Sequence, residues 1–423
     1  MNDSRRGAVF VLPPASTRQQ PPIAALITTA GWAAGAKHVL GDAWIATSRG
    51  ACTIDEARTM ATKGHDDGRR QGGVRGVLRH VLPNGVRLCL NDCDRVGRAM
   101  LSSGSALHGP WQDAGLAFVW QRHHLMPSSG FRLARRMGVP LVLSVHSLVE
   151  EEAESWGVSK GLRGRIVERL AEVPFLQKAD LLACVSQELV RDVVDRGVSP
   201  ERVIVTPNGV DTSVMKPLSE AERLELRRTM QVEDMFVITW VGSFRPFHAL
   251  DLLVDAAASL PGVERVVLLL VGDGDERHRI EARTRELGVK AIFPGLVSQA
   301  EVARLLGASD AAVLPVRGHE EYHYSPVKLR EYMACGLPVV AGAAGELGRW
   351  LKDGTDALLT VPGDARSMAE RLALLQDDAG LRQRLGEAAH AKALSEASWA
   401  SRVEQVVAAL AELDGRLRAR RTT

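Results

Sequence analysis

The feature that most constrains the fold is an alternation of short aliphatic runs with longer helical patterns, which occurs in two successive series along the chain. This alternation is typical of a parallel β-sheet with helices on both faces. The runs are apolar without interruption, which indicates strands buried on both faces. Because domains average about 150 residues, a chain of 423 residues holds more than one core. The sequence therefore predicts an α/β protein with two parallel-sheet domains.

The expected strands fall into two sets, separated by a charged helical pattern at residues 220–230. Strands are expected at residues 8–12, 43–46, 87–90, 116–120, 140–145, 181–185 and 203–206, and then at 236–242, 266–271, 291–293, 311–314, 338–341 and 357–360. The expected domains are an N-terminal domain at 1–212, a linker at 213–234, a second domain at 235–395 and a C-terminal helix at 396–423. We expect that helix to cross back onto the first domain.

Composition and charge exclude several classes of protein. Lys and Arg total 53 against 51 Asp and Glu, so the net charge of +2 provides no field that attracts nucleic acid. The five cysteines are odd in number and scattered, as reduced thiols are, and Cys89 and Cys93 lack a second Cys/His pair at zinc-finger spacing. The apolar run at residues 8–12 is too short for a signal-peptide core, and no stretch reaches the about 20 apolar residues of a membrane helix. We therefore expect a cytoplasmic protein.

The segment richest in chemistry covers residues 322–340. Ser325-Pro326 predicts a helix start, with the serine hydroxyl as the cap and proline at the first helical position. Lys328 then lies in the first turn, where a lysine opposes the helix dipole unless an anion shares the site. A phosphate bound at this N-terminus meets that condition, and Glu331, one turn further on, can accept both hydroxyls of a ribose. The alternative is a capped amphipathic helix whose charges face water.

Two further turns follow expected strands of the second domain. Gly242, Arg245 and His248 precede a helix expected at residues 250–259, and the arginine can contact a pair of phosphates with its forked guanidinium. The alternative for this turn is that its arginine and histidine face water. Gly272 lies in a Gly-Asp-Gly turn that lacks the third glycine of a dinucleotide fingerprint. We expect a tight turn there, with its backbone near a ligand, and no nicotinamide site.

The candidates of the first domain lie at strand ends and near one helix start. His146 and Arg122 follow expected strands, the position from which sheet proteins present side chains to ligands. The two adjacent histidines after Arg122 point to different faces, so a shared metal ion is not expected. Gly31 and Gly35 are expected to flank a helix start, where a ligand or the opposite domain can approach the backbone. The alternative is that these histidine, arginine and glycine residues have only a structural role.

In order and spacing, these segments resemble the retaining glycosyltransferases of family 4, which have the GT-B fold of two Rossmann-like domains that face a cleft. The resemblance covers about residues 115–365 and is faint before them. The segments that carry it are 138–146, 179–186, 207–211, 242–248, 271–274, 294–297 and 325–340.

The resemblance implies that the second domain binds a nucleotide sugar and that the first contacts the acceptor. Glu331 would hold the ribose, the backbone near Val297 would contact the base, and the start of the helix would surround the diphosphate. The residues so implied are His146, Arg245 and Lys328 as catalytic, Gly242, His248, Gly272, Val297, His323, Ser325, Val327 and Glu331 as donor-binding, and Gly31, Gly35 and Arg122 on the acceptor side.

Two positions depart from the family pattern. His248 stands where the family has a lysine that stabilises the departing phosphate. His323 stands where the family has the first of two glutamates, which normally contacts the donor sugar, and Glu320 and Glu321 are out of register with it. A subgroup with Ser-Pro-x-Lys-Leu before the second glutamate shares this loss, so the departure does not imply an inactive enzyme.

The implied activity is transfer of a hexose from a nucleoside diphosphate to an acceptor hydroxyl with retention of anomeric configuration, without a metal ion or another cofactor. The expected partners are a UDP-, GDP- or ADP-linked sugar and a sugar, lipid or small-molecule acceptor. Two alternatives stay open: a non-catalytic nucleotide- or glycan-binding GT-B protein, and a nucleotide-sugar epimerase or hydrolase. Basic residues at positions 132–136 and 160–169 form either a solvated helix surface or a face that contacts anionic lipid at the inner membrane.

Overall fold

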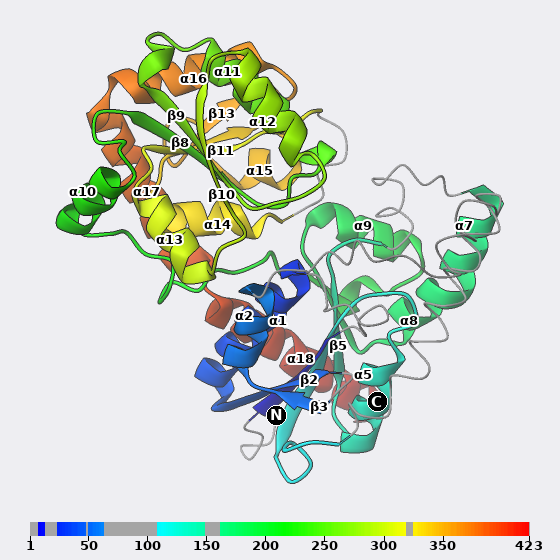
Figure 1. Cartoon of the computed structure of the whole chain (residues 1–423). Coiled ribbons are helices and arrows are strands. Elements are labelled where there is room, and N and C mark those ends of the chain that lie inside the picture. Colours follow the sequence, from blue (N-terminus) through cyan, green and yellow to red (C-terminus); the bar gives the residue numbers. More distant parts are fainter. Residues whose placement is uncertain are drawn as a thin grey trace, which may run out of the picture. The chain divides into compact units, whose positions relative to one another are not determined.

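The chain forms two compact units, one of Met1–Pro207 with Arg402–Thr423 and the other of Asn208–Ser401. The computed structural model describes residues 7–12, 23–47, 50–62, 108–148, 161–318 and 325–422 (Figure 1). Each unit is built on a sheet of parallel strands with helices around it, as the alternating pattern predicts. No helix among these described residues has the length and apolar character needed to cross a membrane.

The first unit contains a seven-stranded sheet in the order β3-β2-β1-β4-β5-β6-β7. Its pairs are parallel except for β3, which runs antiparallel to β2. β3 was not predicted, because its Gly-Ala-Cys sequence carries no strand pattern. The expected strand at 87–90 lies outside the described residues. The strands are β1 (Gly7–Val11), β2 (Asp42–Thr47), β3 (Gly50–Cys52), β4 (Leu116–Arg122), β5 (Leu141–Val145), β6 (Leu181–Cys184) and β7 (Val203–Val205).

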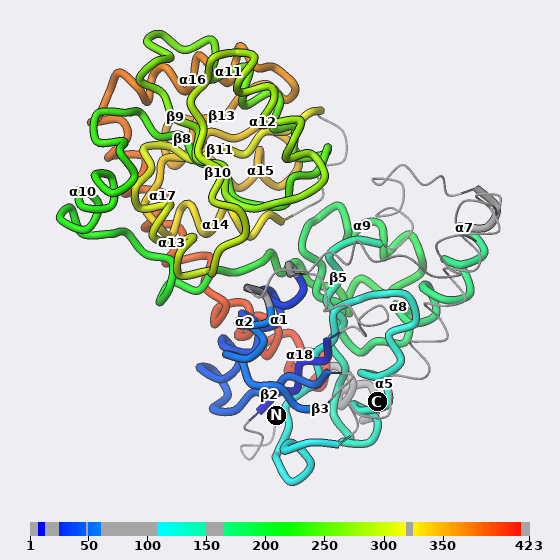
Figure 2. The backbone as a smooth tube through the Cα atoms, in the orientation of Figure 1, coloured from blue at the N-terminus to red at the C-terminus, as the bar shows by residue number. Residues whose placement is uncertain are grey.

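Local capping signals set several helix ends of this unit. Ser186 accepts a hydrogen bond from the Leu189 amide and so caps α9, and Gly138, at φ 65°, ends α5 in the left-handed conformation. The last helix, coloured red in Figure 2, belongs to the first unit from Arg402 onward. The helices are α1 (Ile23–Leu40), α2 (Ile54–Thr62), α5 (Ser128–Met137), α7 (Gly161–Val167), the π-helical turn η2 (Glu168–Glu172), α8 (Val173–Lys178), α9 (Gln187–Asp195), the 3-10 turn η3 (Pro200–Arg202) and α18 (Trp399–Thr422).

The expectation that Gly31 and Gly35 flank a helix start is wrong. Both lie inside α1, which begins at Ile23, and both are buried where α1 packs on β1, β2 and α2. Glycine costs only about 1 kcal/mol relative to alanine inside a helix, and the burial of this apolar helix outweighs that cost. These glycines therefore give no turn at which the backbone opens to a ligand.

The second unit contains a six-stranded parallel sheet in the order β10-β9-β8-β11-β12-β13. Its central strands are buried on both faces: Val267 and Leu269 of β9 belong to one apolar cluster, and Leu268 and Leu270 belong to another. This is why the strand sequences are apolar without alternation. The strands are β8 (Phe236–Val241), β9 (Val266–Val271), β10 (Lys290–Gly295), β11 (Ala311–Leu314), β12 (Val339–Gly342) and β13 (Leu358–Thr360).

The segment 213–234, expected as a linker, lies within the second unit. Its helix α10 (Glu220–Thr229) starts with a capping box of Ser219 and Glu222. Arg223 and Arg227 both contact the Asp310 carboxylate, at 2.6 and 3.0 Å, and so attach the helix to the start of β11. The other helices are η4 (Pro246–His248), α11 (Leu250–Ala258), η5 (Val263–Arg265), α12 (Arg277–Glu286), α13 (Gln299–Gly307), α14 (Val327–Ala334), α15 (Gly345–Trp350), α16 (Ala365–Asp377) and α17 (Ala379–Glu396).

The strand orders locate one topological switch point in each sheet. In the second unit the order reverses between β8 and β11, and in the first it reverses between β1 and β4. Open α/β sheets bind ligands beyond the carboxyl ends of the strands at such points. The segment after β8 leads to Arg245 and His248, and the end of β4 carries Arg122. Both regions named by sequence motifs thus coincide with switch points.

Candidate functional site

The turns after β8, β9 and β10 are held together by their backbones. The Gly242 amide donates to the Val271 carbonyl at 2.9 Å, and the Gly272 amide donates to the Gly295 carbonyl at 2.9 Å. Gly272 has φ 124°, and a Cβ atom added to it would lie 1.9 Å from the Gly242 carbonyl oxygen. Only glycine fits this close approach.

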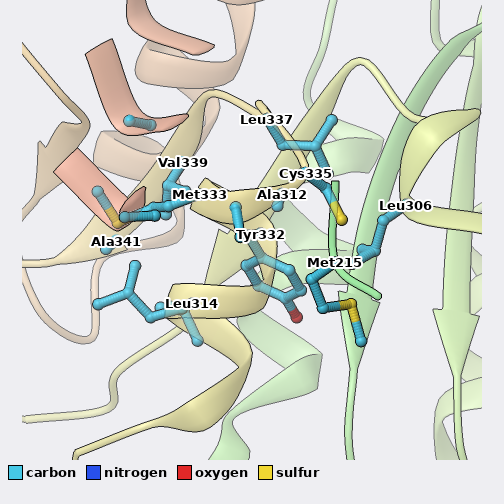
Figure 3. Packing of buried hydrophobic residues seen from close by; sticks show 14 of the residues in the cluster. Met215, Leu306, Ala312, Leu314, Tyr332, Met333, Cys335, Leu337, Val339 and Ala341 are labelled. Carbon is cyan, nitrogen blue, oxygen red and sulfur yellow. The ribbon is translucent and has the colours of Figure 1, made fainter. Parts of the chain in front are cut away.

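The helix α14 is attached to β8 by a side chain to which the sequence motifs assign no role. The Tyr332 hydroxyl accepts a hydrogen bond from the Val241 amide at 2.7 Å. Figure 3 shows the Tyr332 ring among buried side chains that include Met215 and Leu314. Because Val241 ends β8 directly before Gly242, this bond sets the distance between α14 and the turn that follows β8.

The expected capping role of Ser325 is wrong. Pro326 occupies the N-cap of α14, which has no side-chain capping bond. The Ser325 hydroxyl instead accepts from the Asn208 amide at 3.0 Å, and the Ser325 carbonyl accepts from the Asn208 side chain at 2.6 Å. Asn208 is 117 positions away in the sequence, so the local pattern could not reveal it as the competing partner. Ser325 therefore fixes the segment that enters α14 and leaves the amides of its first turn without a side-chain cap.

Lys328 carries a buried ammonium group without a hydrogen-bond partner among the described residues. Its Nζ lies 4.3 Å from the centroid of the Trp240 ring, and a Cβ atom at Gly242 would lie 2.5 Å from this nitrogen. Burial lowers the pKa of Lys328 to about 7, although the charge of Glu331 acts in the opposite direction. An anion bound here would supply the missing partner and restore the charge.

Glu331 is a buried carboxylate one turn after Lys328, with 7% of the residue exposed. Its Oε1 accepts a hydrogen bond from Gln299 Nε2 at 3.3 Å. Burial raises the pKa of Glu331, while the Gln299 hydrogen bond and the Lys328 charge act to lower it. In its ionised form this carboxylate can accept hydrogen bonds from two vicinal hydroxyls.

Arg245 and His248 lie in the turn after β8 but differ in charge. Arg245 contacts the Asp275 carboxylate at 2.5 Å. The His248 ring lies 5.2 Å from the Trp240 ring, between centroids. Burial, together with the charges of Lys328 and Arg245, lowers the pKa of His248 to about 2. His248 is therefore neutral at neutral pH and does not replace the positive charge of a lysine.

The remaining donor-side candidates lie at the same end of the sheet, with one exception. Val297 is half-buried two residues after the end of β10, and Val327 is the first residue of α14. Gln299, which follows Val297 closely, was missed because a single polar residue at a helix start carries no motif. His323 lies outside the described residues. The cluster described here thus combines the turns after β8 and β9 with the starts of α13 and α14.

The first unit has its own group of candidates at the ends of β4 and β5. Arg122 Nη1 donates to the Thr28 hydroxyl of α1 at 3.2 Å, and the His146 Nε2 atom lies 3.2 Å from the Ser144 hydroxyl. Burial, followed by the charges of Arg122 and His123, lowers the pKa of His146 well below its usual range. His146 is therefore a neutral ring that can donate or accept a hydrogen bond.

The two adjacent histidines do not form a metal site together. His123 Nε2 contacts the buried Glu172 carboxylate at 2.7 Å, whereas His124 Nδ1 contacts the Leu125 carbonyl at 2.9 Å. Across the described ranges no group of three or more His, Cys, Asp or Glu side chains is placed to hold a metal ion.

Comparison with known proteins gives two family matches. Residues 235–378 match the model described as glycosyl transferases group 1, and residues 108–214 match glycosyltransferase family 4. These ranges include the candidates of the second unit and those at the ends of β4 and β5, respectively.

Two similar curated proteins carry the same activity name. The chain is 32% identical over 309 residues to a D-inositol 3-phosphate glycosyltransferase of Geodermatophilus obscurus, a match that covers 69% of this chain and 65% of that protein. It is 31% identical over 307 residues to the protein of that name from Actinosynnema mirum, covering 69% of this chain and 71% of the relative. The matched stretch thus spans about two thirds of these relatives.

Among solved structures, Anabaena HepE in complex with UDP and glucose has a TM-score of 0.65 at 18% identity, covering 96% of this chain and 99% of that one. The glycosyltransferase WaaG, of lipopolysaccharide biosynthesis, has a TM-score of 0.60 at 17% identity, with 95% and 98% covered. Both similarities support the two-domain fold of parallel sheets.

Proposed function

This chain belongs to glycosyltransferase family 4 and has the GT-B fold, and on that premise we propose that it transfers a hexose from a nucleoside diphosphate to an acceptor hydroxyl with retention of configuration. The observation that carries the proposal is the buried Lys328 ammonium without a partner among the described residues, one turn before the buried Glu331 carboxylate. A nucleoside diphosphate supplies an anion for the first and a pair of hydroxyls for the second.

In the proposed reaction the bond between the anomeric carbon and the phosphate oxygen loosens first, to an oxocarbenium-like state. The acceptor oxygen then bonds to the same face of the sugar, and its proton leaves with the diphosphate. Lys328 and Arg245 stabilise the charge that builds on the departing phosphate. His146 contacts the donor sugar as a neutral ring. These roles need no metal ion, and we predict that the transfer proceeds without one.

The proposed donor is a UDP-linked hexose, because HepE binds UDP and glucose and shares this fold. For the acceptor we propose a phosphorylated polyol, since the curated relatives are D-inositol 3-phosphate glycosyltransferases. Sugar transfer distinguishes this function from its alternatives. A non-catalytic binding protein would bind UDP without releasing it from any donor, whereas an epimerase or hydrolase would consume the donor without an acceptor.

Glu331→Ala is expected to weaken UDP binding by about 10- to 100-fold, because hydrogen bonds to a charged group contribute about 1.5–3 kcal/mol. Isothermal titration calorimetry with UDP measures this loss. The matched control is Glu286→Ala, which removes an exposed carboxylate from α12 of the same unit and should leave UDP affinity unchanged. Equal affinity of Glu331→Ala and the wild type would refute the ribose contact.

The proposed reaction uses a cytoplasmic nucleotide sugar, and the first unit offers a surface for an anionic membrane. Leu170 is 71% exposed and Ile166, one helical turn earlier, is 49% exposed. The exposed residues Arg165 and Arg169 flank them in α7 and η2. Exposed apolar residues beside arginines suit contact with anionic lipid.

The double variant Ile166→Ser/Leu170→Ser is expected to reduce binding to phosphatidylglycerol vesicles by about tenfold, because two apolar side chains no longer enter the lipid. Vesicle co-sedimentation measures this change. The control, Leu374→Ser/Leu394→Ser, removes two exposed leucines, 47% and 50% exposed, from the second unit. If the two double variants sediment alike, or if the wild type does not bind these vesicles, the proposed lipid contact is wrong.

A further inference from the structure

The start of α13 lies beside the Glu331 carboxylate. Gln299 is the first residue of α13, and the Ser298 hydroxyl caps this helix by accepting from the Glu301 amide at 3.2 Å. The cap fixes the backbone at Gln299, whose Nε2 then donates to Glu331 Oε1 at 3.3 Å. Within the described part of the chain, this is the hydrogen bond that the carboxylate receives.

A buried carboxylate remains ionised only when nearby groups compensate for lost hydration. Among the residues that the structure describes, three groups interact with Glu331. Lys328 acts on it through charge, and Cys335 is a neutral thiol, since burial first and the Glu331 charge second raise its pKa to about 12. Gln299 differs from both because it donates a hydrogen bond that also orients the carboxylate. Among the described residues, Gln299 engages Oε1 and no donor occupies Oε2.

We propose that Gln299 is a positioning residue, which holds the Glu331 carboxylate so that its second oxygen meets the ribose hydroxyls of the nucleotide. This inference rests on the proposed function and extends it with a residue that does not itself need to contact the ligand. It also links two parts of the site, because Gln299 follows Val297 closely at the segment expected to contact the base. The preference for a ribose over a 2′,3′-dideoxyribose then depends on α13 as well as on α14.

The test compares UDP with 2′,3′-dideoxy-UDP, which lacks both ribose hydroxyls, by isothermal titration on the full chain. Gln299→Met keeps the length of the side chain and removes the donor. The variant is expected to bind UDP about five- to tenfold more weakly, while its affinity for the dideoxy compound stays unchanged. The dissociation constant for dideoxy-UDP divided by that for UDP therefore falls by the same factor. If the variant binds UDP and dideoxy-UDP more weakly by the same factor, the substitution disturbs the site in general, and the proposal is wrong.

The pH dependence of UDP binding gives a second readout. Glu331 must be ionised to accept the ribose hydroxyls, so binding is lost as the pH falls through the pKa of Glu331. Loss of the Gln299 hydrogen bond removes one cause that lowers this pKa. The acid limb of the binding profile should therefore move to higher pH in Gln299→Met, and an unmoved limb would contradict the proposal.

The matched control is Gln383→Met. Gln383 donates to Glu387 at 2.9 Å on the exposed side of α17, so the same chemical change is made at a second Gln–Glu pair. This control should leave the UDP to dideoxy-UDP ratio unchanged, and Gln299→Ala serves as a second variant if the methionine disturbs folding. A wild type that does not distinguish the two ligands refutes the ribose assignment of the proposed function itself. A wild type that distinguishes them, with Gln299→Met retaining the same ratio, refutes only the role of Gln299.

Discussion

Lys328→Met is expected to weaken UDP binding by about 100-fold and, at the same time, to stabilise the ligand-free protein. Truncating one member of a desolvated charge pair costs about 2–5 kcal/mol of binding free energy. In the free protein, however, the Lys328 ammonium is buried without a hydrogen-bond partner among the described residues. Burial is the main cause that lowers the pKa of Lys328, and an apolar side chain of similar length does not carry this desolvation cost.

The stabilisation should depend on pH in a defined direction. Because the pKa of Lys328 is lowered from 10.5 to about 7, the unfolded state binds more protons than the folded state between these values. Wild-type stability therefore rises with pH through this window as far as Lys328 contributes. The advantage of Lys328→Met is on the order of 2–4 kcal/mol at pH 6 and declines toward pH 10.

Chemical denaturation at pH 6 and pH 9 measures this difference, with UDP titration as the functional readout. The matched control is Lys290→Met, since Lys290 is exposed at the start of β10. That variant should change neither stability nor UDP affinity. If Lys328→Met destabilises the free protein at pH 6 or binds UDP as the wild type does, the interpretation of Lys328 as an unmet charge is wrong.

Gly272→Ala is expected to lower the free energy of unfolding by about 3–5 kcal/mol and to abolish UDP binding. The new Cβ would lie 1.9 Å from the Gly242 carbonyl oxygen, which is backbone and cannot move without displacing the turn after β8. The φ of 124° adds strain for any residue with a Cβ. The displaced turn is the one that contains Arg245 and His248.

Gly288→Ala separates the two contributions to this effect. Gly288 has φ 68°, also in the left-handed region, but a Cβ there would meet nothing within 4 Å. Gly288→Ala should therefore lower the free energy of unfolding by only about 1 kcal/mol, because of backbone strain. Urea denaturation of both variants gives the comparison. Equal losses for the two variants would show that the close approach of Gly272 and Gly242 contributes nothing.

Much of the second unit could be predicted from sequence. Its strands are continuous apolar runs, and in the structure their residues alternate between two buried clusters, as Val267 and Leu268 do. The positions of Lys328 and Glu331 on α14 also followed from sequence, because residues three apart on a helix share a face. Within the described residues the expected strands are present, with ends shifted by at most two residues.

The errors have a common physical cause, which is competition from contacts distant in sequence. Ser325 has the residue type of a cap, but Asn208 engages its hydroxyl. Gly31 and Gly35 have the residue type of a turn, but the packing of α1 keeps them helical. Tyr332 contacts the Val241 amide across a gap of 91 positions, and no local pattern indicates such a bond.

A crystal structure of the full chain with UDP tests the central claim most directly. The claim is that the cluster beyond β8 and β9 binds a nucleoside diphosphate through Lys328 and Glu331. The predicted result places a diphosphate oxygen within hydrogen-bond distance of Lys328 Nζ and both ribose hydroxyls on the Glu331 carboxylate. UDP bound elsewhere in the protein, or bound here with its ribose directed away from Glu331, would contradict the claim.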